Sequence, residues 1–246
     1  MIRLSVNVNK VATLRNSRGG ATPNVLDAVE VCLAAGAGGI TVHPRADERH
    51  IAPGDVRAIA RLLAPHRARG IEYNLEGDPR PDWLALVREV RPDQATLVPV
   101  RPGELTSEAG WAEGAGTDAL RARIAELRAA SIRVSMFVDA NVRAVEFAHA
   151  LGAERVELFT GPFATAFARD PAEGRAVFAR HVEAAERAHA LGLGVNAGHD
   201  LDLDNLVVYR ALPHLAEVSI GHALVGRALF VGLDRAVHEY LESLGG

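Results

Sequence analysis

The chain has 246 residues, 48% of them hydrophobic and 24% charged, with a formal net charge of −4 and an isoelectric point near 6.2. Its length suits one large domain or two small ones, and its composition is that of a globular protein with a sizeable core. The acidic balance argues against nucleic acid as a partner, because contacts to a phosphate backbone require a basic surface.

The single cysteine, Cys32, lies in the apolar run Val29–Gly36 and predicts a small core residue without a disulfide. The N-terminus lacks the basic and then apolar layout of a secretory signal. No apolar run approaches the roughly 18 residues that a membrane span requires. We therefore expect a soluble, cytoplasmic protein with no membrane partner.

Short runs of strand composition recur along the whole chain, and longer alanine-rich stretches with apolar residues at helical spacing follow them. The predicted strands are Arg3–Asn7, Gly39–His43, Ile71–Glu76, Ala95–Val98, Arg133–Val138, Arg155–Phe159, Gly194–Asn196 and Glu217–Ile220. The predicted helices are Val25–Ala35, Pro53–Leu63, Pro81–Glu89, Thr117–Ala130, Asn141–Leu151, Glu173–Leu191, Leu203–Ala211 and a final one over about Ala223–Leu244.

Eight alternating strand and helix pairs predict a parallel sheet, and eight is the number of strands that closes a TIM barrel. Several predicted helices end at a glycine before the next strand, as left-handed helix caps do. In the final helix, the apolar residues share one face: Leu229, Leu233, Ala236, Val237 and Tyr240. The α/β fold class is therefore a single (β/α)8 barrel of residues 1–246, with an open, doubly wound sheet as the alternative.

The segment Arg101–Thr117 departs from this pattern, since it is polar, rich in glycine and longer than most connections. We interpret it as a lid or a substrate-binding loop after the fourth predicted strand.

Polar residues cluster at the carboxyl ends of the predicted strands, where TIM barrels carry their catalytic groups. His43 and Glu76 end the second and third strands, and His199 and His222 each follow a glycine directly after a strand. No helical packing pattern accounts for the histidine at position 43. The other strand ends supply Asn7, Asn9, Lys10, Arg45, His50, Asp139, Glu157 and Asn196.

Two loops have the form of a phosphate site. Ser219–Ala223 and Asn196–His199 each pass out of a strand through a glycine, and barrels often bind phosphate on the loops after strands seven and eight. In the first loop, Arg15, Arg18 and the pair Gly19–Gly20 could hold another anionic group or form only a solvated basic surface.

Neither a zinc-like ligand spacing nor a nucleotide-binding glycine motif is present. The residues alone leave three alternatives open. The first is a sugar-phosphate aldolase or epimerase with Lys10 as a Schiff-base nucleophile. The second is a hydrolase with a metal held by His43, Glu76, His199 and His222. The third is a phosphate-metabolite sensor or scaffold without turnover.

Six segments together resemble the pyridoxine 5′-phosphate synthase family, in the family's order and over nearly the whole chain. They are VNVNKVATLRNSRGG (Val6–Gly20), GITVHPRADERHI (Gly39–Ile51), YNLEG (Tyr73–Gly77), LTSEAGW (Leu105–Trp111), VNAGHDL (Val195–Leu201) and IGHALVGRAL (Ile220–Leu229).

The resemblance implies the condensation of 3-amino-2-oxopropyl phosphate with 1-deoxy-D-xylulose 5-phosphate to pyridoxine 5′-phosphate, phosphate and water, without a metal or a redox cofactor. His43 and Glu76 match proton acceptors, and His199 matches the proton donor. Contacts to the aminoketone phosphate match Asn7, Arg18, Gly221 and His222, and contacts to the deoxyxylulose phosphate match Arg45, His50 and Thr106. The resemblance also implies a cytoplasmic homo-octamer of barrels with extra helices.

The chain departs from the family's usual residues at two places. Asn9 and Lys10 stand where the family usually has Asp-His, at positions that touch the deoxyxylulose phosphate. Asp200 stands where glycine is frequent, at a position whose backbone meets the aminoketone phosphate.

Overall fold

The computed structural model describes residues 1–100, 107–114 and 116–245. Within them, eight parallel strands pair in sequence order and close into a barrel, with the last strand beside the first. The predicted (β/α)8 barrel is confirmed, and each predicted strand ends within two residues of the observed one. The strands are β1 (Arg3–Asn7), β2 (Gly39–Val42), β3 (Glu72–Gly77), β4 (Gln94–Leu97), β5 (Arg133–Asp139), β6 (Arg155–Phe159), β7 (Gly194–Gly198) and β8 (Leu215–Ile220).

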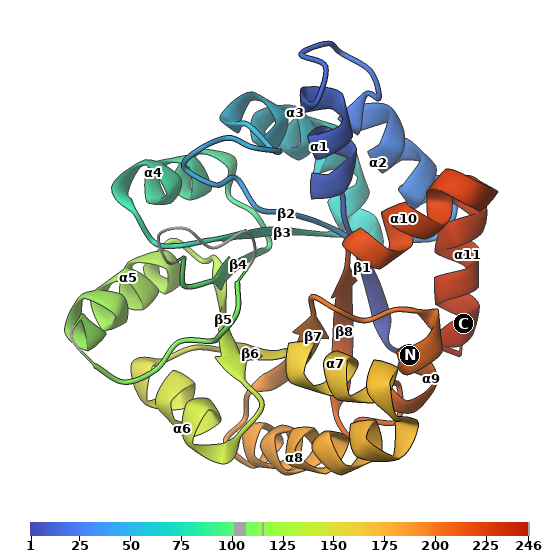
Figure 1. Cartoon of the computed structure of the whole chain (residues 1–246). Helices are drawn as coiled ribbons and strands as arrows, with labels where there is room; N and C mark the ends of the chain where they lie inside the picture. Colours follow the sequence, from blue (N-terminus) through green and yellow to red (C-terminus); the bar gives the residue numbers. More distant parts are fainter. Residues whose placement is uncertain (101–106, 115, 246) are drawn as a thin grey trace.

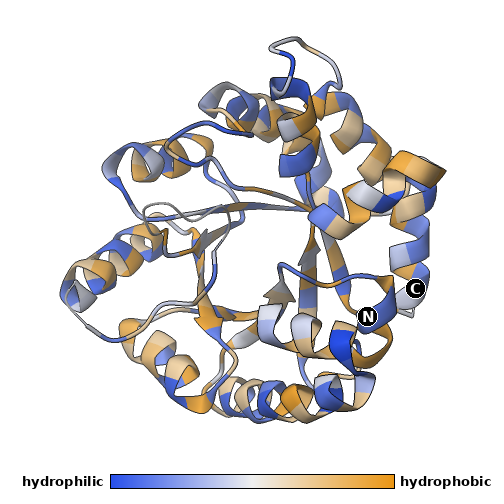
Figure 2. Cartoon of the chain, in the orientation of Figure 1, coloured by the Kyte–Doolittle hydropathy of each residue, from blue (hydrophilic) through white to orange (hydrophobic). Residues whose placement is uncertain are grey.

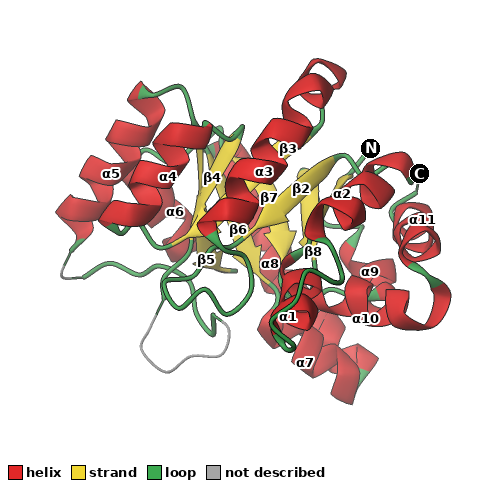
Figure 3. Cartoon of the chain, turned by 90° about the horizontal axis from the view of Figure 1, so that it is seen from above, coloured by secondary structure: helices red, strands yellow, loops and turns green. Residues whose placement is uncertain are grey.

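The helices form a ring outside these strands (Figure 1). They are α1 (Asn9–Asn16), α2 (Val25–Ala34), α3 (Pro53–Leu63) with the 3-10 turn η1 (Ala64–Arg69), α4 (Pro81–Val90), α5 (Thr117–Ala129), α6 (Val142–Leu151), α7 (Gly161–Arg169), α8 (Pro171–Ala190), α9 (Leu203–Tyr209), α10 (His222–Val231) and α11 (Leu233–Ser243). The residue pattern alone did not predict α1 and α7, which with α10 lie toward the same end of the barrel (Figure 3).

The predicted final helix over Ala223–Leu244 is wrong, because two helices occupy that range. Gly232 separates α10 from α11 with φ +88° and ψ 151°, a conformation that interrupts the helix and favours glycine. Leu229 consequently leaves the shared apolar face and is 69% exposed, whereas Val237 and Tyr240 on α11 are buried.

Apolar side chains occupy the layer between strands and helices. Alternate residues of each strand, such as Ile40, Val42 and Leu75, are fully buried and join the large hydrophobic core that includes the inner faces of the helices. Polar and apolar residues accordingly alternate along the outer helices (Figure 2). None of the helices in the described part of the chain is long and apolar enough to cross a membrane.

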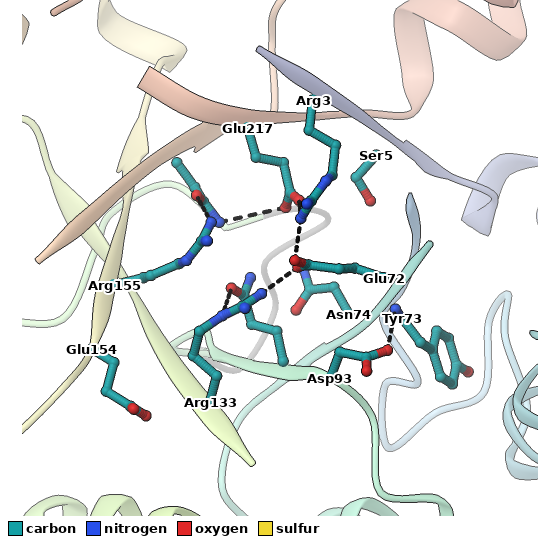
Figure 4. A network of polar contacts seen from close by, with 12 residues as sticks. Arg3, Ser5, Glu72, Tyr73, Asn74, Asp93, Arg133, Glu154, Arg155 and Glu217 are labelled. Carbon is teal, nitrogen blue, oxygen red and sulfur yellow. Dashed lines mark hydrogen bonds and ion pairs between the residues drawn. The ribbon is translucent and has the colours of Figure 1, made fainter. Parts of the chain in front are cut away.

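The other strand face, inside the barrel, is polar. At the amino-terminal end, Arg3 forms ion pairs with Glu72 and, at 3.5 Å, with Glu217 (Figure 4). Arg133 pairs with the same Glu72, and Arg155 donates to Asn196 Oδ1 at 2.8 Å. Charged side chains from five strands therefore fill a space that aliphatic residues fill in most TIM barrels.

A second layer, nearer the carboxyl ends, consists of neutral polar groups. The hydroxyls of Ser5 and Thr41 lie 2.7 Å apart, Asn74 donates to Thr41 at 3.3 Å, and Thr96 donates to Asn74 at 2.9 Å. Because these groups form hydrogen bonds with one another, their burial costs little free energy.

Glu72 should be important for stability, because two arginines depend on it. Burial opposes its ionisation, but the hydrogen bonds and charges of Arg133 and Arg3 outweigh burial and lower its pKa. Glu72→Ala should reduce the free energy of unfolding by about 2–4 kcal/mol, slightly below the loss for a fully buried pair. Urea denaturation measures this, with Glu89→Ala at the exposed Arg57–Glu89 pair as the control. Equal effects of the two substitutions would contradict the prediction.

Candidate active site

A cavity of about 520 Å³ opens at the carboxyl ends of the strands. Eleven of the thirteen predicted site residues line it: Asn7, Asn9, Lys10, His43, Arg45, His50, Glu76, His199, Asp200, Gly221 and His222. Arg18 lies in the exposed turn after α1 and does not line the cavity. Residues 101–106 of the predicted lid, Thr106 among them, and residue 115 lie outside the described residues.

His43 and Glu76 face each other on neighbouring strands. His43 follows β2, Glu76 lies on β3, and the distance from His43 Nδ1 to Glu76 Oε2 is 3.8 Å. Asn7, at the end of β1, donates to the same carboxylate oxygen at 3.4 Å. Trp83 on α4 fixes the strand end, since its ring nitrogen donates to the Glu76 carbonyl at 2.9 Å.

Burial sets the protonation of Glu76. Its side chain is nine-tenths buried, and desolvation raises its pKa to about 7; the nearby charge of Glu217 adds to the rise and His199 opposes it. A carboxyl group that titrates near neutrality can both accept and return a proton during turnover.

Burial acts in the opposite direction on His43. Desolvation, followed by the charges of His50 and Arg45, lowers its pKa to about 3, so the imidazole is neutral at physiological pH. Its Nε2 is buried and has no hydrogen-bond partner among the described residues. The Asn9 side chain fixes the backbone here, because Asn9 Oδ1 accepts from His43 N at 2.9 Å. A neutral ring with an unused nitrogen inside a cavity suits a base that meets its partner only in the substrate.

The loop after β2 brings Arg45 and His50 together. Both are 8% exposed, and burial with the charges of Arg45 and Lys10 lowers the pKa of His50 to about 4. His50 Nδ1 accepts from the backbone of Ile51 at 2.9 Å, which leaves Nε2 as the protonated donor. A guanidinium and an imidazole N–H at one wall of a cavity can bind an anion.

Arg15 holds this loop in place and does not bind an anion through a free guanidinium. Its two terminal nitrogens pair with the Asp55 carboxylate at 2.6 and 2.9 Å, and Asn16 donates to the His50 carbonyl at 2.7 Å. The sequence left two interpretations of Arg15 open, an anion ligand and part of a solvated basic surface. The ion pair with Asp55 fits neither of them.

The start of α10, after β8, offers backbone N–H groups to the cavity. Gly221 is the N-cap residue, no side chain caps the helix, and His222 is its first residue. A side chain at position 221 would come within 3.0 Å of the Asn7 carbonyl and Cβ, so glycine is needed for the close approach. The exposed amides of a helix N-terminus attract an anion.

His199 follows β7 with φ +97°, an uncommon conformation for a non-glycine residue. Its ring lies near the aromatic rings of Phe159 and Phe137, with centroid distances of 5.7 and 6.4 Å. The neighbouring Asp200 directs its carboxylate to His199, where Oδ2 lies 2.7 Å from Nδ1.

Glu157, on β6, was expected only among the polar strand-end residues, with no role of its own, and it lines the cavity. It is 4% exposed, and burial together with the charges of Glu76 and Glu217 raises its pKa well above the usual value. A neutral carboxylic acid in this position can donate a hydrogen bond to a substrate. The signal was a charged residue between Val156 and Leu158 in a buried strand. The cavity is also lined by Thr13, Arg49, Val98, Ser107, Phe137 and Ser219.

The donors in this part of the chain do not form a metal cluster. Among the residues that the structure describes, no three histidine, cysteine, aspartate or glutamate side chains are arranged to hold a metal ion. The geometry gives no support to the hydrolase alternative built on His43, Glu76, His199 and His222.

The raised pKa of Glu76 makes a prediction for stability. Below about pH 4.5 the carboxyl is protonated in both the folded and unfolded states, and above that pH the unfolded state ionises first. The contribution of Glu76 to stability therefore falls as pH rises and levels off above about 7. Glu76→Gln, which cannot ionise, should be more stable than the original protein at pH 8 by up to about 3 kcal/mol. Near pH 4.5 the difference should vanish.

Melting temperatures at the two pH values measure this effect. Glu30→Gln, at an exposed position on α2, serves as the control. Its melting temperature should differ from that of the original protein by the same amount at both pH values. A Glu76→Gln protein that is less stable than the original at pH 8 would contradict the prediction.

Solved structures with the same architecture share little sequence with this chain. A 3-hexulose-6-phosphate synthase superposes with a TM-score of 0.62 at 13% identity, covering 99% of this chain and all of that one. Phosphoribosyl anthranilate isomerase from Thermotoga maritima gives 0.59 at 14% identity and covers both chains completely. These likenesses show the barrel fold alone.

Sequence relatives are much closer. The family model described as pyridoxal phosphate biosynthesis protein PdxJ matches residues 4–245. Proteins named pyridoxine 5′-phosphate synthase are 49% identical in Leptospira biflexa, with 99% of this chain and 97% of that protein covered, and in Bacteroides fragilis, with 99% and 100% covered. With the barrel, the cavity and its acid–base residues, these matches show that the chain belongs to the PdxJ family of pyridoxine 5′-phosphate synthases.

Proposed function

We propose that the chain condenses 3-amino-2-oxopropyl phosphate with 1-deoxy-D-xylulose 5-phosphate to pyridoxine 5′-phosphate, with release of phosphate and water, as a step of vitamin B6 biosynthesis. The observation that carries the proposal is the His43–Glu76 pair, with the pKa of the carboxyl near 7 and that of the ring near 3, in a cavity that His199 also lines.

The reaction consists mainly of proton transfers. Building the pyridine ring requires amine attack on a ketone, dehydration, loss of phosphate and an aldol-type ring closure. Each step needs an acid or a base within reach, and a well-placed group contributes roughly 10²–10⁴-fold to the rate. Glu76, with a pKa of about 7, can exchange protons at little free-energy cost near neutral pH, and the neutral ring of His43 is available as a proton acceptor.

The two substrates each carry a phosphate, and the phosphates repel each other. Separate anion sites on different walls would hold them apart while the amine meets the ketone. Gly221 and the N-terminus of α10, with Asn7 and His222 beside them, suit the aminoketone phosphate. Arg45 and His50 suit the deoxyxylulose phosphate. Arg18 and Thr106 remain predictions from the resemblance.

The roles of the acid–base groups follow from their protonation. His43, neutral and with an unused Nε2, would take the proton from the attacking amine. Glu76, near half-ionised at pH 7, would move protons at the carbon and imine centres. His199, paired with a carboxylate, would protonate a leaving hydroxyl.

The Schiff-base alternative finds weaker support. Lys10 is exposed in the first turn of α1, whereas a lysine nucleophile is usually desolvated or beside another cation in a way that lowers its pKa. Borohydride with a ketose phosphate would trap an enzyme-bound imine on Lys10 if that reading were correct.

The proposal predicts that the protein and both substrates together produce pyridoxine 5′-phosphate absorbance and inorganic phosphate in equal amounts. Glu76→Gln should reduce turnover at least about 100-fold and leave substrate affinity nearly unchanged, because the amide keeps the shape but cannot accept the proton. Steady-state rates and calorimetric titration measure the two quantities.

Two outcomes would count against this proposal. Binding of both substrates without product by the original protein would favour the sensor alternative. A Glu76→Gln rate above about a tenth of the original would remove Glu76 from its assigned role.

We further propose that the chain works in the cytoplasm as a homo-octamer, as the resemblance implies. Leu229 and Phe230 on α10 are 69% and 87% exposed, and Leu14 on the adjoining α1 is 50% exposed. Exposed large apolar side chains on adjoining helices are typical of a protein interface, here with a second copy of this chain.

Light scattering tests the assembly. The original protein should have eight times the chain mass of 26.2 kDa, and Phe230→Asp should form smaller species. Val142→Asp on α6 is the matched control and should leave the mass unchanged. A monomeric original protein would contradict the proposal.

A further inference from the structure

Asp200 stands directly beside His199, and the two side chains are joined. His199 Nδ1 and Asp200 Oδ2 are 2.7 Å apart, within hydrogen-bond distance, whereas the nearest carboxylate oxygen to His43 Nδ1 is 3.8 Å away. A carboxylate acceptor at Nδ1 requires the proton on that nitrogen and leaves Nε2 for other partners.

Buried groups hold the Asp200 backbone on both sides. Its N–H donates to Thr160 Oγ1 at 3.3 Å, and its carbonyl accepts from the Asn205 amide at 3.1 Å. The Thr160 hydroxyl donates to the Gly198 carbonyl at 2.5 Å, on the residue before His199. Thr160 is fully buried and Asn205 is 3% exposed, so the chain around the pair is held firmly.

The His199 backbone is in a strained conformation, with φ +97°. Such conformations persist where surrounding contacts impose them, and they gather at functional sites. His199 and Asp200 both line the active-site cavity of about 520 Å³ and another one of about 550 Å³ along α7. The pair therefore stands at the boundary of two cavities, with the Asp200 carboxylate at the His199 Nδ1.

We propose that Asp200 is a positioning residue for His199. Its carboxylate accepts a hydrogen bond from Nδ1–H, fixes the ring orientation and tautomer, and stabilises the imidazolium that forms when Nε2 holds a proton. The ring then returns that proton from Nε2 to the substrate's leaving hydroxyl. The inference rests on the proposed function, in which His199 is the proton donor, and gives Asp200 a role different from the expected backbone contact to a phosphate.

The variants Asp200→Asn and Asp200→Gly test the role. Asparagine keeps the shape but removes the charge and allows its N–H₂ group to face Nδ1, which favours the other tautomer; in a serine protease the same exchange leaves the geometry intact and is strongly deleterious. Both variants should lower kcat at least about tenfold and change the KM of each substrate less than about threefold. Asp204→Asn, on the exposed side of α9, removes the same charge and should leave kcat unchanged.

A spectroscopic measurement separates positioning from general damage. In protein labelled with ¹⁵N-histidine, the His199 nitrogens should show a protonated Nδ1 in the original chain, and this signature should be lost in Asp200→Gly. Melting temperatures within a few degrees of the original confirm that the variants fold.

The outcomes separate the inference from the proposed function. An original protein that makes no product overturns the proposed function, and the nitrogen spectra still report on the pair. An active original protein whose Asp200 variants keep more than half of kcat overturns the inference. A raised KM at unchanged kcat also overturns it, because Asp200 would then bind substrate and not position the ring.

Discussion

The ion pairs at the amino-terminal end of the barrel are the constraint on which its polar interior depends. Arg3, Arg133 and Glu72 lie part-buried at the amino-terminal end of the closed ring of strands, and Glu217 there is almost fully buried, so leaving these carboxylates unpaired would destabilise the fold. Arg3 pairs with both Glu72 and Glu217, Arg133 pairs with Glu72, and Arg155 donates to Asn196. The barrel interior is largely polar, with Val98, Phe137 and Phe159 as a small apolar cluster toward the carboxyl end, and that end holds the candidate active site.

Desolvation shifts the pKa values of the groups at the open end of the barrel in opposite directions. Burial raises the pKa of Glu76 to about 7 and lowers that of His43 to about 3, because in both cases it disfavours the charged form. Neither group then forms the strong ion pair that their closeness would otherwise allow. A carboxyl and an imidazole 3.8 Å apart remain able to exchange protons with a substrate. Glu157, whose pKa is raised by burial and by the charge of Glu76, is another carboxyl in the barrel interior.

Much of this architecture could be predicted from the sequence, since its causes are local. Alternation along Tyr73, Asn74, Leu75 and Glu76 predicts a strand with one polar face, and a histidine after the apolar run Gly39–Val42 has no explanation in packing. The rule that strand ends meet at one rim then brings distant residues together. Glu157 was indicated only as a strand-end residue without a role, because a lone carboxyl in a strand does not show which groups the neighbouring strands place around it.

What escaped prediction depends on contacts between distant residues or on a single backbone angle. The break at Gly232 needs φ +88°, which glycine permits but does not require, so apolar spacing alone continues the helix through it. From the sequence, Arg15 resembles an anion ligand. In the structure, both of its terminal nitrogens donate hydrogen bonds to the carboxylate of Asp55, forty residues later. The role that we propose for Asp200 likewise depends on the unusual backbone at His199, which turns the imidazole toward the Asp200 side chain. Asp200, at a position where the resemblance leads us to expect glycine, thus gives the acid–base residue His199 a hydrogen-bond partner. The strained backbone of His199 makes this contact possible.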